Sequence, residues 1–144
     1  MSLNVAEKKA VEESWARVSQ PSFQDAGEKV FLRLLKNKST KANFKKFRDI
    51  PFDQLTGNTA LRQHGGKVVQ VLDDFIKGLD GSGYEAVKKV GRIHKAEGMT
   101  SEKIELMKLA LCEVLDDAGC GDHVTKAAWE KLWRLFMAAH SDGY

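Results

Sequence analysis

The sequence predicts an all-α protein. Apolar residues recur at intervals of three and four along almost the whole chain, as they do on the buried face of an amphipathic helix. Only two prolines, Pro21 and Pro51, interrupt this pattern, and no segment alternates apolar and polar residues for long enough to form a convincing strand. The chain has 144 residues and is 42% hydrophobic, so we expect a single domain, residues 1–144, with its own core.

Capping residues delimit the helices of the first half. Asn4 can cap the first helix and Glu7 can close a capping box, and the apolar pattern continues to about Ser19. A second helix is expected from about Phe23 to Lys36. Residues 37–57 form a connector with weak periodicity, in which we expect one or two short helical turns. Connectors of this length in compact domains are often functional.

Four further helices are expected in the second half. Asn58 or Thr59 can cap the first of them, and Thr100 or Ser101 can cap the third, after a glycine ends the second. The inward residues of the first of these helices are Leu61, His64, Val68, Leu72 and Phe75. Those of the second helix are Val87, Val90, Gly91 and His94. Those of the third helix are Ile104, Met107, Leu111, Val114 and Leu115. The last has one stripe of Val124, Ala128, Leu132, Leu135 and Ala139 and a second of Trp129, Trp133 and Phe136, so we expect it to contact neighbours on two sides.

Charge and composition narrow the function classes. The 23 basic and 20 acidic residues are interleaved, which is typical of a solvated surface and not of a nucleic-acid patch. The first ten residues lack the apolar stretch of a secretion signal, and no apolar run approaches the roughly 20 residues of a membrane helix. Cys112 and Cys120 have no metal-finger spacing and are expected to be free thiols. We therefore expect a cytoplasmic protein that binds neither nucleic acid nor membrane.

Two histidines, His64 and His94, lie on the apolar stripes of separate helices. A single inward histidine is usually a core residue hydrogen-bonded to a backbone carbonyl. Burying an imidazole without a partner costs a few kcal/mol, so two such residues suggest a shared reason. Catalytic zinc needs a third protein ligand that neither stripe offers, since His123 is expected in a loop and His140 near the end of the chain. A flat apolar guest with a metal that accepts an imidazole, such as haem, fits the pattern.

With these two histidines on separate helices, the sequence resembles the globins and looks most like the intracellular haemoglobins and myoglobins of invertebrates. The segments that carry the resemblance are "GEKVFLRLLK", "NFKKF", "LRQHGGKVV" and "RIHKAEGM", in that order. The resemblance covers essentially the whole chain and implies a globin fold of seven or eight helices around a pocket for haem b (iron protoporphyrin IX).

The resemblance also implies a role for individual residues. His94 is expected as the proximal iron ligand and His64 as the distal hydrogen-bond donor to bound oxygen. Phe31, His64 and Val68 are expected to line the ligand pocket. The full set expected to bind the cofactor is Phe44, Phe47, His64, Lys67, Val68, Val90, His94, Met99, Ile104 and Met107. Lys46, Lys67 and Arg92 are candidates to pair with the haem propionates, although each is equally well explained as plain surface charge.

Gly27 and Gly65 resemble the paired small residues that let two helices cross closely. A glycine inside a helix costs about 1 kcal/mol, which disfavours an incidental origin.

This sequence departs from the common pattern at two places. Ser39 stands near the position where many globins have a proline, with one residue fewer before Phe44, which leaves open whether Phe44 or Phe47 contacts the haem. Ile93 precedes the proximal histidine where some relatives have a hydroxyl that orients the ring, so a backbone carbonyl is the expected substitute.

The function expected from this resemblance is reversible binding of dioxygen for transport or storage by a protein that is not an enzyme. Three alternatives stay open. The same haem could catalyse nitric oxide dioxygenation or peroxidase chemistry, or His64 could bind the iron in a six-coordinate sensor or redox protein. In a haem-free helical module, both histidines would be core residues, and the aromatic face of the last helix would be a partner surface. The chain is compatible with a monomer or with a homo- or hetero-dimer.

Overall fold

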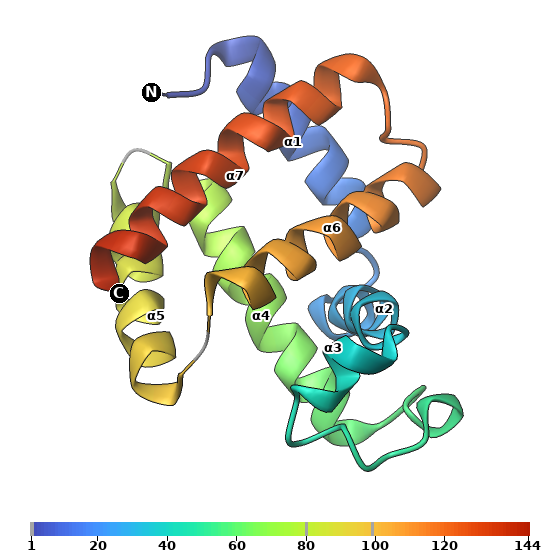
Figure 1. The fold of residues 1–144 in the computed structure, drawn as a ribbon. Coiled ribbons are helices and arrows are strands. Elements are labelled where there is room, and N and C mark those ends of the chain that lie inside the picture. Colours follow the sequence, from blue (N-terminus) through green and yellow to red (C-terminus); the bar gives the residue numbers. More distant parts are fainter. Residues whose placement is uncertain (1, 80, 99) are drawn as a thin grey trace.

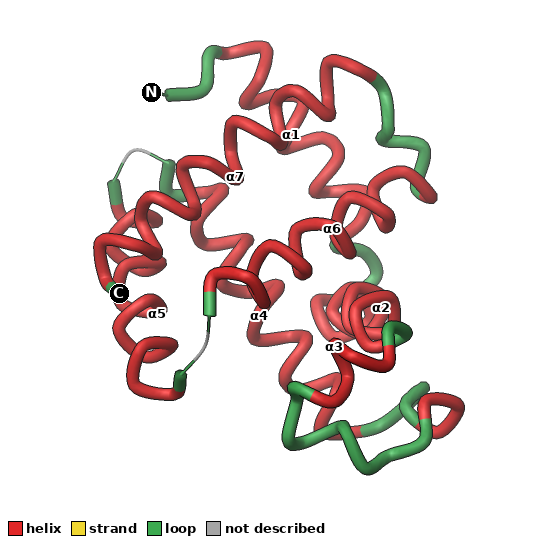
Figure 2. Tube along the Cα trace, in the orientation of Figure 1, coloured by secondary structure: helices red, strands yellow, loops and turns green. Residues whose placement is uncertain are grey.

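The structure, a computed structural model, describes residues 2–79, 81–98 and 100–144. Within these ranges the chain forms seven α-helices and one 3-10 turn and has no strand, which confirms the predicted all-α class (Figures 1 and 2). None of these helices is both long and apolar enough to cross a membrane. The elements are α1 (Val5–Val18), α2 (Phe23–Leu35), α3 (Lys38–Ala42), η1 (Phe52–Gln54), α4 (Thr59–Lys77), α5 (Ser82–Glu97), α6 (Ser101–Asp117) and α7 (His123–Gly143).

Most helices begin at the caps that the sequence indicates. The Asn4 side chain accepts a hydrogen bond from the backbone N–H of Glu7, and the Glu7 carboxylate accepts one from the backbone N–H of Asn4, both at 2.8 Å. Asn58 caps α4 and Thr100 caps α6, and α5 ends at Gly98, whose positive φ of 74° favours glycine. One expectation is wrong: His123 is not in a loop but begins α7, because Asp122 caps that helix.

The close crossing of α2 and α4 depends on two glycines. A Cβ atom at Gly27 would overlap the backbone of Gly65, and one at Gly65 would lie 2.7 Å from the carbonyl carbon of Gly27. Backbone atoms cannot move aside as a flexible side chain can, so only glycine fits either position. The predicted pairing of these two glycines is therefore confirmed. The crossing brings Phe31 of α2 beside His64 of α4, with ring centroids 5.1 Å apart.

The last helix lies between α1 and α5, as its wide apolar face predicts (Figure 1). Trp129, Trp133 and Phe136 are all buried, and the indole N–H of Trp129 donates to the hydroxyl of Ser14 at 2.8 Å. The aromatic face is thus part of the core and is not a free partner surface, contrary to the haem-free alternative. Val124, predicted on the inward stripe, is instead 61% exposed; in this first turn of α7 the buried residue is Thr125.

The C-terminal part of α7 packs directly on α5. A Cβ atom at Gly91 would overlap the carbonyl oxygen of His140, and one at Gly143 would overlap the carbonyl oxygen of Lys88. The two helix backbones therefore touch along about one turn, as those of α2 and α4 do at Gly27 and Gly65. Gly91 precedes His94 by three residues, so this contact places α7 against the part of α5 that presents His94.

Candidate haem pocket

A cavity of about 310 Å³ lies among α4, α5, α6 and α7, with one wall completed by Phe31 of α2 and by Phe44, which follows α3. This volume is within the range of small-molecule pockets in proteins. Its lining is mainly apolar, and the polar groups that reach it are few. The lining residues are Phe31, Phe44, His64, Lys67, Val68, Val71, Leu72, Val90, Ile93, His94, Glu97, Lys103, Ile104, Met107, Trp133 and Phe136.

Most of the residues expected at the site line this one cavity. They come from five separate segments of the chain and are Phe31, Phe44, His64, Lys67, Val68, Val90, His94, Ile104 and Met107. Phe47 is not among the lining residues: it is fully buried behind the cavity wall, with its ring centroid 6.3 Å from that of His64. Met99 lies outside the described residues.

His64 enters the cavity from the distal helix α4 between two aromatic rings. The ring of Phe31 packs edge-on against the imidazole, and the ring of Phe47 makes a second, tilted contact with it. Burial lowers the pKa of the His64 imidazole below its ordinary value, and the positive charges of Lys46 and Lys67 lower the pKa further. The ring is therefore neutral near pH 7, with one N–H that can donate a hydrogen bond and one nitrogen that can accept one.

His94 enters the cavity from α5, and its Nδ1 atom has a partner on α7. Its Nδ1 lies 2.8 Å from Nε2 of His140 on α7, and the two ring centroids are 5.1 Å apart. This side-chain contact replaces the backbone carbonyl that the sequence suggests as the orienting group. Burial lowers the pKa of His94, so the imidazole is neutral and Nε2 is left to bind a metal.

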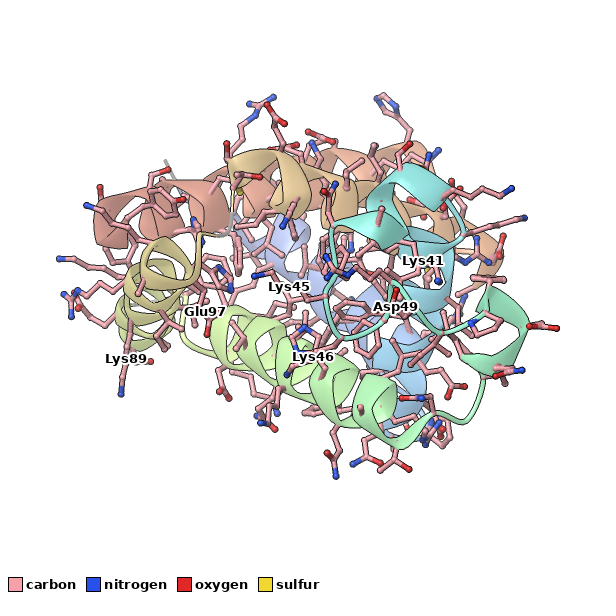
Figure 3. The ribbon with its side chains drawn as sticks, turned by 60° about the horizontal axis from the view of Figure 1, so that its bottom comes forward. Lys41, Lys45, Lys46, Asp49, Lys89 and Glu97 are labelled. Carbon is pink, nitrogen blue, oxygen red and sulfur yellow. The ribbon has the colours of Figure 1, made fainter. Side chains whose placement is uncertain are left out.

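Charged side chains border the pocket where it meets solvent. Lys103 lies 5.8 Å above the ring of Phe44 and donates to the backbone carbonyl of Asn43, so its ammonium group stays at this edge. Lys67 and Glu97 also reach the cavity. Figure 3 shows Lys46 beside α4 and Glu97 at the end of α5 on the same side of the molecule. Arg92, the third propionate candidate, is exposed and is not a lining residue.

Several lining residues are not in the set that the sequence predicts for the site, although Leu72, Trp133 and Phe136 are predicted to face inward. Val71, Leu72, Ile93, Glu97, Lys103, Trp133 and Phe136 line the cavity in addition to the expected set, and His140 contacts His94 behind it. A signal for His140 does exist, because Trp129, Trp133, Phe136 and His140 follow one another at spacings of four, three and four. That spacing extends the aromatic stripe of α7 by one more inward residue.

The residues of the cavity fit a haem group. Apolar walls suit the face of a porphyrin, two imidazoles enter from different helices, and lysines at the edge can pair with carboxylates. The indole N–H of Trp133, which lines the cavity, is buried and has no hydrogen-bond partner within the described part of the chain. A buried donor without a partner costs about 1–3 kcal/mol, which favours a polar or π-rich occupant nearby.

Fold and site together define a class: helical proteins that enclose a flat prosthetic group between two histidine-bearing helices. Residues 23–140 match the family model described as Globin. The chain belongs to the globin family. Globins bind haem and, through it, diatomic gases such as dioxygen; most are oxygen binders and not enzymes, although some members have enzymatic activity.

Individual relatives resemble the chain over nearly its full length. It is 29% identical to a globin of Buccinum undatum, covering 96% of this chain and 99% of the relative. It is 32% identical to the hemoglobin heart muscle subunit alpha-type of Aquarana catesbeiana, covering 90% of this chain and 91% of that subunit. A solved structure of the hexa-coordinate hemoglobin of Drosophila melanogaster superposes with a TM-score of 0.82 at 25% identity, covering 96% of this chain and 94% of the other.

Proposed function

We propose that this protein binds dioxygen reversibly on haem b, for storage or transport, with His94 as the proximal iron ligand and His64 as the distal hydrogen-bond donor. One observation carries the proposal: two neutral imidazoles from α4 and α5 enter the same apolar cavity. Among the described residues, His94 has a side-chain hydrogen-bond partner at its Nδ1 and His64 has none. That asymmetry suits a fixed iron ligand on one side and a residue that interacts with the gas on the other.

When bound, the haem supplies a ferrous iron that takes dioxygen. The chain supports this chemistry by excluding water and by donating a hydrogen bond. Phe31 and Val68 lie on the His64 side and occupy space that water would otherwise fill, which slows oxidation to the ferric state. The His64 N–H would donate a hydrogen bond to dioxygen in this pocket, and the low dielectric of the pocket would strengthen that interaction.

The remaining residues hold the prosthetic group in place. Phe44 and Val90 line the cavity and would pack against the porphyrin, as would Ile104 and Met107 of α6. Lys67 and Lys103 border the cavity and would pair with the propionates. Phe47 acts indirectly, because it packs against His64 and not on the cavity. Met99 remains part of this proposal on the resemblance alone.

We further propose that the protein is cytoplasmic and acts as a carrier and not as an enzyme. Cys112 and Cys120 are both free thiols, which is the usual state in a reducing compartment. A monomer and a homo- or hetero-dimer are both compatible with this role.

A second function has a specific observation in its favour. The solved relative from Drosophila melanogaster is a hexa-coordinate hemoglobin, and in this chain His64 also faces the cavity. If His64 binds the iron directly, an external ligand must displace it, and the protein is then suited to sensing or redox chemistry. Against this, the rings of Phe31 and Phe47 both contact His64 and limit how far its side chain can move.

The absorption spectra of the purified protein test both functions. We expect a five-coordinate deoxygenated ferrous form and a lasting oxygenated form, whereas a six-coordinate deoxygenated spectrum would favour the second function. His94→Ala should abolish tight haem retention, while the exposed His123→Ala serves as the matched control and should retain haem as the wild type does. Unchanged haem binding in His94→Ala would contradict the assignment of the proximal ligand.

A further inference from the structure

His140 lies behind the proximal side of the pocket and is not itself a lining residue of the cavity. It is 2% exposed, and its Nε2 is 2.8 Å from Nδ1 of His94. The distance is that of a normal hydrogen bond between ring nitrogens. The bond is part-buried, and burial of the His140 ring limits competition from water, which strengthens the bond.

The placement of His140 is determined by the backbone. Gly91, one turn before His94, lies directly against the carbonyl oxygen of His140, and Gly143 lies against that of Lys88. With no side chains between the two helices here, α7 has little freedom to shift relative to α5. The ring of Tyr144 also contacts that of His140, with their centroids 5.7 Å apart. The imidazole of His140 is thus held at a set distance from His94.

The positions of the protons follow from the metal ligand. An imidazole that binds iron through Nε2 has its lone pair there, so the proton of the neutral ring is on Nδ1. His94 is therefore the donor, and Nε2 of His140 must be the acceptor.

We propose that His140 is a positioning residue for the proximal ligand: its Nε2 accepts a hydrogen bond from the Nδ1–H of His94, orients that ring and increases its electron donation to the iron. The proposal rests on the assignment of His94 as the iron ligand.

Compared with a backbone carbonyl acceptor, an imidazole acceptor changes two properties: the strength of the bond from His94 to the iron and the reduction potential of the haem. An imidazole nitrogen is a more basic acceptor than an amide carbonyl, so His94 gains more imidazolate character and binds the iron more strongly. A more strongly donating ligand also stabilises the ferric state, which lowers the reduction potential of the haem. His140 therefore sets how readily the protein loses its ferrous, gas-binding form.

The test compares His140→Phe, which keeps a planar ring but removes the acceptor, with His140→Gln, which retains an accepting amide oxygen. Met137→Leu, on the same helix and outside the cavity lining, is the packing control. The readouts are the iron–histidine stretching frequency by resonance Raman, the reduction potential, and the rate of haem transfer to an acceptor protein. The Raman spectrum is recorded on the deoxygenated ferrous form, or on the photolysed carbon monoxide form if the former is six-coordinate.

We expect His140→Phe to lower the stretching frequency, raise the reduction potential and speed haem loss by about tenfold or more, the effect usual for removal of a partner of a metal ligand. His140→Gln should recover part of each change, and Met137→Leu should change none of them. If the frequency and the potential of His140→Phe equal those of the wild type, the inference is overturned.

A measurement on the wild-type protein covers the case in which His140→Phe does not fold. In the low-spin ferric cyanide form, the His94 Nδ1 proton should exchange slowly and show a nuclear Overhauser effect to the His140 ring protons. Its absence overturns the inference. Failure of the proposed function looks different: haem is then not bound, or is bound equally well by His94→Ala.

Discussion

His64 and His94 face the same cavity but are supported by different kinds of contact. His64 is flanked by the rings of Phe31 and Phe47, which make apolar contacts and do not use its N–H. His94 is paired with His140 through a hydrogen bond. Apolar contacts limit the orientation of a ring without using its polar atoms, whereas a hydrogen bond determines which nitrogen bears the proton. This difference suits a gas-binding donor on one side and a metal ligand on the other.

Replacing His64 by Leu tests the distal role. Haem should be retained, because His94 is unchanged, but dioxygen should dissociate faster by about tenfold or more and the iron should oxidise faster. A hydrogen bond to a charged group contributes about 1.5–3 kcal/mol, which corresponds to that change in rate. Stopped-flow oxygen release and the decay of the oxygenated spectrum measure both. A His123→Leu variant controls for the loss of a surface imidazole, and equal oxygen release in both variants would contradict the distal role.

Two pairs of helices near the pocket, α2 with α4 and α5 with α7, meet at glycines. Gly27 and Gly65 set the crossing of α2 and α4, and Gly91 and Gly143 set the contact of α5 with α7. In each pair one helix contains a histidine of the site. A glycine inside a helix has an intrinsic cost, which is offset here by the backbone contact that it permits. The histidines are therefore located by helix packing as much as by their own side-chain contacts.

Neighbouring glycines of α4 provide a matched test of this packing. Gly27→Ala or Gly65→Ala should lower the free energy of unfolding by about 3 kcal/mol, the upper end of the usual cost of overpacking, because the new methyl group meets backbone atoms. Gly66→Ala should be neutral or stabilising, since its methyl group comes close only to the side chain of Gln24, at 3.0 Å, lies at ordinary contact distance, 3.7 Å, from the backbone of Gln24, and alanine is the better helix former. Urea denaturation measures all three, and a similar effect for Gly65 and Gly66 would contradict the close-crossing argument.

Three histidines, His64, His94 and His140, lie at or directly behind the cavity. Burial is the main cause of the lowered pKa at His64, His94 and His140, and in each case it disfavours the charged form. Burial of these three imidazoles therefore lowers the stability of the folded protein at any pH where they would be protonated in the unfolded chain. Without a prosthetic group, this cost makes its stability sensitive to acid in a range where most carboxylates are still ionised.

The haem-free protein should accordingly become less stable as the pH falls through 6.5, the ordinary pKa of histidine. Since the folded-state pKa values are lowered, the unfolded chain binds more protons in this range, and the free energy of unfolding decreases with falling pH. The urea midpoint measured between about pH 7.5 and pH 5.5 should show this slope. His140→Phe removes one of the three groups and should show a shallower slope, whereas a midpoint independent of pH in the wild type would contradict the prediction.

The helical class, most helix boundaries and the inward histidines are determined by the sequence itself. Periodicity and caps are local properties, so Asn4, Asn58, Thr100 and Gly98 all act where the pattern predicts. The cavity residues His64 and His94 follow from the same periodicity, because a helical stripe shows which residues face inward.

Only the tertiary structure decides which inward residues meet one another. Phe44 lines the cavity and Phe47 lies behind it because of how the segment after α3 packs, and no local pattern distinguishes the two. His140 follows the aromatic spacing of α7, yet its contact with His94 joins residues 46 positions apart and exists because two helix backbones touch at glycines. A stripe gives the face of a helix, whereas the partner across the interface depends on how two helices are positioned in space.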